Sequence, residues 1–532
     1  MKLHYSLDSA IVLDADHGPL TLDMLKEAGV NTIWLYGFFF GKLWSPIEEM
    51  VKAADLLRVH GFEVGVIQLP VGHPGNGLNP DDDSLDLRLP AHWSYRLDHE
   101  GLPVYYCAAI EDAMIEDNVR SVRELKAAGF TQFFIDDDLR SGLWGERMSG
   151  CFSDRAIAGF NAAYARNVDR AALVRARDDA SDQTLVKEWI AYQCEQLTGF
   201  MASMADKDVR VGLMVMHLGD ERQGIDIAAV KKRIPDCLFR VGEFHFDDRT
   251  FGTAEGKASE WFSMIYHLDA MGREYAFSET TVFPAKALSP DNLIFKARLA
   301  LIAGIPNLLL MSGTWLITEE YWRLLASELP ELKALEERCA RSERDSPIHV
   351  AYGTSWHAEA IQPYTLPILA GLPVRPVRAG FEDGPDSGDA PEFEGADCLL
   401  FVGDYEVTPE WERRFVHYGT VLMDQTAYRR NRQKLEALGG SNVEVLDYAA
   451  GELPAAVEIE RLRSKLLAGG PVAYPMLTTG SNILLIWHRE AARVLLVNLA
   501  EQPTAGTLVY KGKECEIQMK PLEIMDLSLK QI

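Results

Sequence analysis

Three consecutive aspartates end an apolar run at residues 133–140, which read FFIDDDLR. Side chains alternate along a strand, so Asp136 and Asp138 share one face while Asp137 takes the other. Carboxylates held close together raise each other's proton affinity, which lets one of them act as a general acid near neutral pH. Arg140 follows and could temper this charge or hold an anionic group. A divalent-metal site and a helix N-cap cluster are the alternatives.

A further carboxylate, Glu279, ends a later apolar run in the segment AFSETTVFP. Cleavage of a glycosidic bond needs one carboxyl group to protonate the leaving oxygen and another to attack the sugar or activate water. Asp138 and Glu279 would supply such a pair from two different strand ends. A glutamate that only caps a helix is the alternative.

Polar groups also stand at the ends of the other apolar runs, and aromatic residues, on which sugar rings can stack, cluster near residues 34–44. The further candidates for catalysis or substrate binding are Asp14, Asp16, Tyr36, His217, Glu243, His245 and Trp315.

The order of the elements indicates how these residues would be positioned. Up to residue 345, short apolar runs alternate with amphipathic stretches that often end in Gly, a frequent helix terminator. Eight such units predict an α/β fold, a (β/α)₈ TIM barrel whose active site lies at the carboxyl ends of the strands. A doubly wound open sheet is the alternative. The expected strands are 10–16, 31–39, 62–70, 131–138, 209–217, 238–246, 274–280 and 307–314.

The rest of the chain predicts two smaller domains. Residues 346–465 alternate strand and helix patterns, which is typical of a Rossmann-like α/β domain. Residues 466–532 read as short strands with polar turns and predict a small C-terminal β-sandwich. Neither GxGxxG nor a P-loop is present, so we expect no nucleotide site and no cofactor.

Charge and composition narrow the possible partners. The net charge of −26, from 53 basic and 79 acidic residues, argues against binding to nucleic acid or an anionic membrane. The first residues do not read as a signal peptide, and no apolar run is long enough to span a bilayer. Seven scattered cysteines without a CxxC pair fit a reduced, cytoplasmic protein.

A barrel followed by a Rossmann-like domain and a small β domain resembles the family 42 glycoside hydrolases, β-galactosidases with a trimerisation domain. In that family the acid/base ends strand 4 in an Asn-Glu pair, and the nucleophile ends strand 7. The resemblance therefore implies Asp138 as acid/base, Asp137 in place of the Asn, and Glu279 as nucleophile of a retaining enzyme. It also implies a homo-oligomer, a dimer or a trimer.

Many members of that family carry a zinc cluster made from a cysteine after strand 3 and a Cys-x-Cys-x-x-Cys run after strand 4. Here Cys107 and Cys151 match, but Ser153 and Ala156 occupy the other two positions. Two thiols do not complete a tetrahedral zinc site, so we expect no metal.

The layout also resembles the family 156 sialidases, inverting barrel enzymes with an acidic residue at the end of strand 1 and a catalytic histidine on strand 4. Asp14 and Asp16 match the first feature, whereas the segment FFIDDDLR contains no histidine. Arg140, Arg240 and Arg249 could bind the carboxylate of an acidic sugar through a bidentate fork.

The sequence thus predicts a glycoside hydrolase that removes a terminal sugar from a small glycoside or oligosaccharide by a retaining mechanism. An inverting, exo-sialidase-like hydrolase is the first alternative. A non-catalytic carbohydrate-binding barrel, or a barrel enzyme that uses Mg²⁺ or Mn²⁺ on its aspartates, is the alternative of another class.

Overall fold

The computed structural model describes residues 1–70, 89–136, 141, 148–179, 182–218, 221–243, 245–313, 316–340, 343–352, 364–378, 397–403, 406–437, 442–447, 456–468 and 472–532. The chain divides into two compact units. The first comprises Met1–Phe246 and His267–Glu336, and the second comprises Asp247–Tyr266 and Glu337–Ile532.

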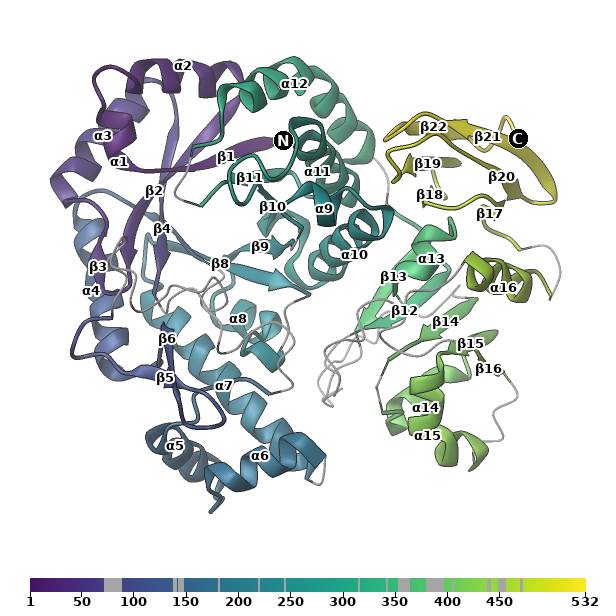
Figure 1. The fold of residues 1–532 in the computed structure, drawn as a ribbon, viewed down its shortest axis with the longest axis horizontal. Coiled ribbons are helices and arrows are strands. Elements are labelled where there is room, and N and C mark those ends of the chain that lie inside the picture. The colour runs from purple at the N-terminus through teal and green to yellow at the C-terminus, as the bar shows by residue number, and fades with distance from the viewer. Residues whose placement is uncertain are drawn as a thin grey trace. The chain divides into compact units, whose positions relative to one another are not determined.

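The first unit is a closed barrel of eight parallel strands (Figure 1). Their order around the barrel follows the chain, and the sheet closes because β1 pairs with both β2 and β11. The predicted TIM barrel is therefore confirmed. The strands are β1 Lys2–Leu7, β2 Val30–Phe39, β4 Glu63–Leu69, β7 Gln132–Ile135, β8 Arg210–His217, β9 Leu238–Gly242, β10 Ala276–Thr281 and β11 Asn307–Met311, and a short antiparallel β3 (Lys42–Leu43) extends β2.

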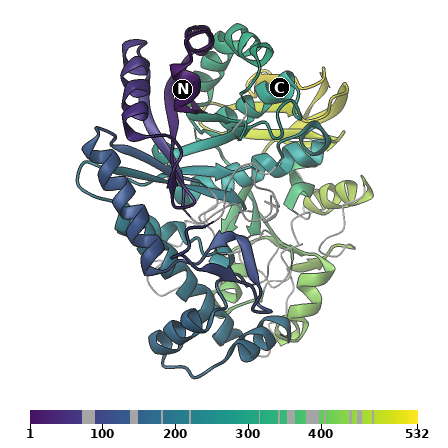
Figure 2. The ribbon, with the colours of Figure 1, turned by 60° about the vertical axis from the view of Figure 1, so that its left-hand side comes forward.

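Helices follow the strands and surround the barrel (Figures 1 and 2). Their apolar residues face the sheet; in α11, for example, an N-cap serine and Pro290 start a helix that is buried along most of its length. The helices of the first unit are α1 Ser9–Leu13, α2 Gly18–Glu27, α3 Ile47–Val59, α4 Asp112–Ala127, α5 Asp154–Tyr164, α6 Arg170–Asp179, α7 Gln183–Met204, α8 Ile227–Arg233, α11 Pro290–Ala303 and most of α12 Glu319–Ala340. Helix α9 Asp248–Phe251 and most of α10 Ala254–Met271 belong to the second unit.

The first strand lies earlier in the chain than the sequence pattern predicted. Residues 10–16 do not form a strand, because Asp8 caps the one-turn helix α1 by accepting a hydrogen bond from the Ala10 N–H at 2.8 Å. The strand is instead Lys2–Leu7, whose carboxyl end leads directly into Asp8. The other seven expected strands overlap the observed ones.

Two insertions at the carboxyl ends of the barrel strands bear on the pockets described below. The antiparallel hairpin of β5 (Tyr95–Leu97) and β6 (Pro103–Ala108) lies between β4 and α4. Helices α5 and α6 lie between β7 and the long helix α7, and are drawn below the barrel in Figure 1.

The second unit contains the two predicted smaller folds. Five parallel strands in the order β13-β12-β14-β15-β16 form a doubly wound sheet, and two three-stranded antiparallel sheets, β17-β20-β21 and β18-β19-β22, form the C-terminal part. The elements are β12 Ile348–Tyr352, α13 Thr365–Leu369, β13 Val374–Arg378, β14 Cys398–Phe401, α14 Pro409–Phe415, β15 Thr420–Met423, α15 Gln425–Ala437, β16 Val443–Val445, α16 Ala456–Leu467, β17 Met476–Thr479, β18 Ile483–His488, β19 Arg493–Asn498, β20 Thr504–Tyr510, β21 Lys513–Met519 and β22 Ile524–Ser528.

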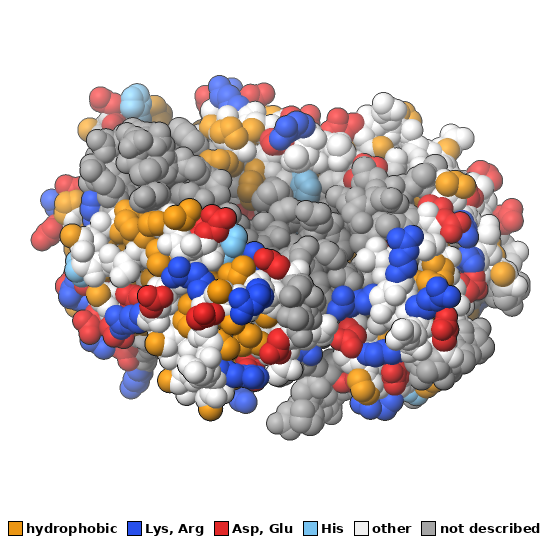
Figure 3. All heavy atoms as spheres, turned by 60° about the horizontal axis from the view of Figure 1, so that its bottom comes forward, with side chains coloured by type: hydrophobic (Ala, Val, Ile, Leu, Met, Phe, Trp, Pro, Cys, Tyr) orange, Lys and Arg blue, Asp and Glu red, His pale blue; other side chains and the backbone are white. Residues whose placement is uncertain are grey.

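Acidic and basic side chains are interspersed on the molecular face drawn in Figure 3. In the described parts of the chain, no helix combines the length and the apolar character needed to cross a membrane.

Candidate active site

The interior of the barrel is apolar at its base and becomes polar toward the carboxyl ends of the strands. Trp34, Phe134, Phe277 and Leu309 belong to one buried interior cluster. Because side chains alternate along a strand, Asp136 and Glu279 point to the same side as Phe134 and Phe277, one step nearer the mouth. The strand ends thus present carboxylates to the barrel interior, where barrel enzymes carry their active sites.

Glu279 is held by two partners that fix both of its carboxylate oxygens. Oε1 lies 2.9 Å from Nη2 of Arg240 on β9, and the side chains of the pair are 6% and 2% exposed. Oε2 accepts a hydrogen bond from the N–H of Glu243 at 2.7 Å. Arg240 also points Nη1 toward Sδ of Met311 at 3.3 Å. The result is a buried, oriented carboxylate opposite a guanidinium.

Glu243 lies directly after β9 and makes the reciprocal contact. Its Oε1 accepts a hydrogen bond from the N–H of Glu279 at 3.0 Å, so each glutamate binds the other's backbone. Its Oε2 lies 3.4 Å from Nζ of Lys296 on α11, and both side chains are fully buried. Lys296 also donates to the His245 carbonyl at 2.8 Å. Two buried ion pairs therefore support the ends of β9 and β10.

The two predicted histidines lie close to each other. His217 ends β8 and is buried, and its ring meets that of His245 edge to face with centroids 5.7 Å apart. His245 follows β9, so the structure brings together two residues predicted from different strand ends.

The ends of β1 and β2 carry aromatic residues and one carboxylate. Tyr36 donates its hydroxyl to the carbonyl of Gly313 at 2.6 Å, and Trp44 donates its indole N–H to Asp8 Oδ2 at 2.7 Å. The Tyr36 and Trp44 rings meet edge to face at 5.7 Å. Burial raises the pKa of Tyr36, and the nearby charges of Asp8 and Asp136 add to this effect. Tyr36 therefore remains a protonated donor, and both aspartates lie within electrostatic range of it.

Asp14 and Asp16 do not lie at a strand end, so the prediction that they end the first strand was wrong. Both are exposed in the turn between α1 and α2. Asp14 Oδ1 accepts hydrogen bonds from the N–H groups of His17 at 2.7 Å and Asp16 at 2.9 Å, and these bonds lower the pKa of its carboxyl group. Asp8 occupies the strand-1 position that sequence reasoning assigned to them.

Four predicted site residues lie outside the described residues: Asp137, Asp138, Arg140 and Trp315. Asp136, at the edge of this segment, is 8% exposed and donates its N–H to the Gln68 carbonyl at 2.9 Å. Of the two other arginines proposed to bind an acidic sugar, Arg240 is engaged with Glu279, and Arg249 is an exposed residue of α9 in the second unit.

The residues at the positions of the family 42 zinc cluster do not fit a zinc ion. Cys107 and Cys151 are free thiols, but Ser153 is the N-cap of α5 and accepts the Ala156 N–H at 3.2 Å. Among the described residues, no group of three or more His, Cys, Asp or Glu side chains could hold a metal ion.

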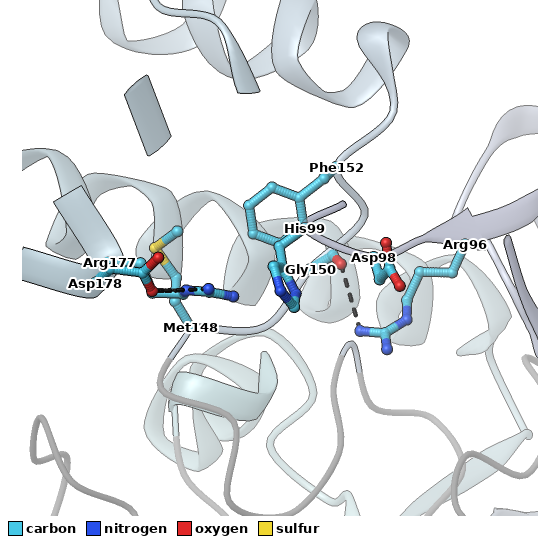
Figure 4. A pocket seen from close by; sticks show the side chains of 8 residues that line it. All are labelled: Arg96, Asp98, His99, Met148, Gly150, Phe152, Arg177 and Asp178. Carbon is cyan, nitrogen blue, oxygen red and sulfur yellow. Dashed lines mark hydrogen bonds and ion pairs between the residues drawn. The ribbon is translucent and has the colours of Figure 1, made fainter. Parts of the chain in front are cut away.

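A pocket of about 240 Å³ lies beside the β5–β6 hairpin (Figure 4). One wall carries Arg177 paired with Asp178 at 2.7 Å, and another carries Arg96, whose guanidinium contacts the Gly150 carbonyl. None of the catalytic candidates lines this pocket. We therefore place the candidate active site at the barrel interior, on the geometry of its carboxylates.

Sequence reasoning missed Asp8 and Lys296 as members of the site, and it included Trp44 only among the aromatic residues near 34–44. A signal existed for each. Residues 2–7 read as a strand that ends in Asp8, Trp44 stood in the aromatic segment, and Lys296 interrupts the apolar helix sequence LIFKARLALIA.

Comparison with known proteins adds to this geometry. No family model matches the sequence, and no curated protein matches it. Among solved structures, the chain is similar to Gan42B, a GH42 β-galactosidase, with a TM-score of 0.60 and 12% identity over 99% of this chain and 97% of that one. The likeness is one of fold.

A catalytic mutant of Gan42B from G. stearothermophilus gives a TM-score of 0.61 and 11% identity, with 98% of this chain and 97% of that chain covered. The match spans both units of the chain, so the layout that suggested family 42 is confirmed as a fold.

Proposed function

We infer that this protein is a glycoside hydrolase whose attacking group is the carboxylate of Glu279. The observation that carries this inference is the position of Glu279 inside the barrel at the end of β10, with one oxygen on Arg240 and the other on the Glu243 N–H. Similarity in fold to a family 42 β-galactosidase supports the same reading.

The two partners of Glu279 prepare it for attack on a sugar. Arg240 supplies a positive charge that stabilises the ionised carboxylate, and the N–H of Glu243 fixes its orientation. A nucleophile held in this way loses little freedom on reaching the transition state. Glu279 would form a covalent bond to the sugar, which water then hydrolyses, with retention of configuration.

The proton for the leaving oxygen would come from Asp138, which follows Asp136 by two residues in the sequence and lies outside the described residues. A retaining pair stands about 5–5.5 Å apart, whereas inverting carboxyl groups stand roughly 6.5–9.5 Å apart. Asp136 and Tyr36 would bind sugar hydroxyls, and Trp44 would offer an aromatic face.

The test is hydrolysis of a panel of aryl glycosides, with neutral sugars beside a sialoside and a glucuronide. Glu279→Gln should lower kcat on the best substrate by about 10⁴-fold or more, because loss of a nucleophile has effects on this scale. Glu274→Gln, five residues earlier and exposed, is the matched control and should leave kcat unchanged.

Near-normal kcat in Glu279→Gln would remove Glu279 from the mechanism. Binding of sugars by the wild-type protein without hydrolysis of any substrate would identify a carbohydrate-binding barrel instead. Cleavage of the sialoside alone, with inversion, would favour an enzyme that uses Asp8 at the end of β1, in the role first expected for Asp14 and Asp16.

A further inference from the structure

A second pocket of the barrel unit lies between the segment that follows β6 and the helices α4, α5 and α7. Its volume is about 280 Å³, and its lining includes Cys151, Tyr192 and Gln193 together with Glu111 and Arg155. None of the carboxylates assigned to hydrolysis belongs to this lining. The volume lies just below the roughly 300–1,000 Å³ of pockets for drug-sized ligands, so it suits a molecule of the size of one sugar ring.

The amide of Gln193 is the group that points to a ligand. This side chain is 7% exposed, and its Nε2 is buried without a hydrogen-bond partner. Buried polar atoms nearly always find a partner, so an unsatisfied donor on a residue that lines a pocket is consistent with an acceptor supplied from outside the chain.

Two glycines leave space for the polar side chains of Gln193 and Tyr192. A Cβ on Gly150 would lie 2.7 Å from Cδ of Gln193, and a Cβ on Gly159 would lie 2.3 Å from the Tyr192 hydroxyl. Burial raises the pKa of Tyr192, and the neighbouring Cys151 adds to this, so the hydroxyl stays protonated. The chain therefore packs an amide and a hydroxyl closely at the same cavity.

The charges around the pocket balance. Arg155 pairs with Asp112 at 2.6 Å and lies 3.7 Å from Glu111. With Arg96, which donates to the backbone carbonyls of Ser141 and Gly150, the lining holds two guanidinium groups and two carboxylates. Two further polar residues, Ser141 and Gln196, and several alanine and isoleucine side chains also line it. A ligand with hydroxyl groups, an apolar face and no net charge matches this lining best.

We propose that this pocket binds a neutral polyhydroxylated ligand of the size of a single sugar ring, with Gln193 and Tyr192 as its hydrogen-bonding anchors. This site is separate from the candidate active site and does not depend on the function proposed for it. The half-buried thiol of Cys151 lines the pocket and can report its occupancy.

The experiment measures the rate at which iodoacetamide alkylates each cysteine of the full chain, by mass spectrometry, with and without D-galactose or D-glucose. At about ten times its Kd, a sugar leaves about a tenth of the pockets open, so Cys151 should react about tenfold more slowly. Cys515, the other half-buried thiol, lies in the second unit and should keep its rate. Monosaccharides carry no glycosidic bond to a leaving group, so hydrolytic activity does not affect the readout.

Variants and probes then test the assignment. Gln193→Leu should remove the protection of Cys151, while Gln183→Leu, on the same helix but outside the pocket, should retain it. The five buried cysteines must stay unreactive in both variants, which shows that the chain is folded. Failure of both sugars to protect Cys151, equal slowing of Cys151 and Cys515, or protection by sulfate alone would overturn the proposal. Equal protection in wild type and Gln193→Leu would overturn the role of Gln193.

Discussion

Charged side chains support the β9–β10 side of the barrel mouth, whereas aromatic donors support the β1–β2 side. On the first side, Arg240 pairs with Glu279, and Lys296 with Glu243, in full or nearly full burial. On the second, Tyr36 and Trp44 donate to a carbonyl and to a half-buried carboxylate.

The difference follows from the cost of burying charge. Removing an ion from water costs several kcal/mol of solvation free energy, which only a well-placed partner offsets. A buried ion pair therefore has little freedom to move. Aromatic rings with one polar atom are buried without that cost and leave faces for a ligand to contact. The first side is therefore suited to holding a reacting group, and the second to binding a sugar.

Among variants of the two sides, Arg240→Met should cause the largest loss of stability and of activity. It leaves the Glu279 carboxylate buried without its guanidinium, which costs about 3–5 kcal/mol of stability. We expect kcat to fall about 10²- to 10³-fold as well, the usual loss when one preorganised electrostatic partner is removed. Urea denaturation and steady-state kinetics measure both effects.

Arg298→Met is the control for Arg240→Met. Arg298 pairs with Glu328 at 2.6 Å, but both side chains are more than a quarter exposed. Exposed pairs contribute about 0–1 kcal/mol, so this variant should lose little stability and no activity. Equal losses of stability and activity in the two variants would contradict the special role of the buried Arg240–Glu279 pair.

Replacement of Lys296 by Met should rank second. Glu243 would lose its counter-charge, with a stability loss of about 3–5 kcal/mol, while Glu279 would keep Arg240. We expect a smaller decrease in kcat than for Arg240→Met. Addition of Glu243→Gln should recover part of the stability, because both charges are then gone. No recovery in the double variant would show that the two side chains do not act as a pair.

The third prediction compares Asp8 with Asp14. Asp8→Asn should lower kcat/KM about tenfold, equivalent to about 1.4 kcal/mol, because it removes a charge near Tyr36 at the strand end. Asp14→Asn alters an exposed turn and should change kcat/KM by less than about twofold. The reverse order would restore Asp14 to the mechanism.

Trp44→Phe should have the smallest effect. It removes one hydrogen bond to the half-buried Asp8, which water can replace in part, so the loss should be about 0.5–1 kcal/mol, at a site that we assign to binding. We therefore expect a higher KM and an unchanged kcat. Trp93→Phe is the control, because Trp93 donates to Asp117 at 2.9 Å rather than to Asp8, and should change stability alone. A lower kcat in Trp44→Phe would assign the aromatic side to catalysis.

Hydrophobic patterns in the sequence predicted the barrel and seven of its strands. This was possible because short apolar strands and amphipathic helices differ in hydrophobic periodicity and so can be told apart. The first strand was misplaced because residues 10–13 are apolar and precede aspartates, as a strand end does, whereas Lys2–Leu7 mixes apolar and polar residues. The capping contact of Asp8 and the pairing of Lys2–Leu7 with β2 and β11 distinguish the two interpretations, and both are geometry rather than composition.

The positions of the site residues were easier to predict from the sequence than their interaction partners. Strand alternation predicted that Asp136 and Glu279 face the barrel interior. It could not reveal that Arg240, considered for a sugar carboxylate, is engaged by Glu279, because that pairing depends on the register between two strands. Lys296 lies 53 residues from Glu243, and its contact arises only when α11 packs on the sheet.

The reciprocal contacts of Glu243 and Glu279 have an architectural consequence. Strands β9 and β10 pair at two positions, Ala276 with Phe239 and Phe277 with Arg240. Beyond these pairs, the side chains of Glu243 and Glu279 link the two strands. These two side-chain hydrogen bonds continue the connection between the strands where the backbone pairing ends. The carboxylate that we propose as the nucleophile therefore also links β9 to β10, so replacing Glu279 by a side chain without an acceptor oxygen should weaken the contact between these two strands.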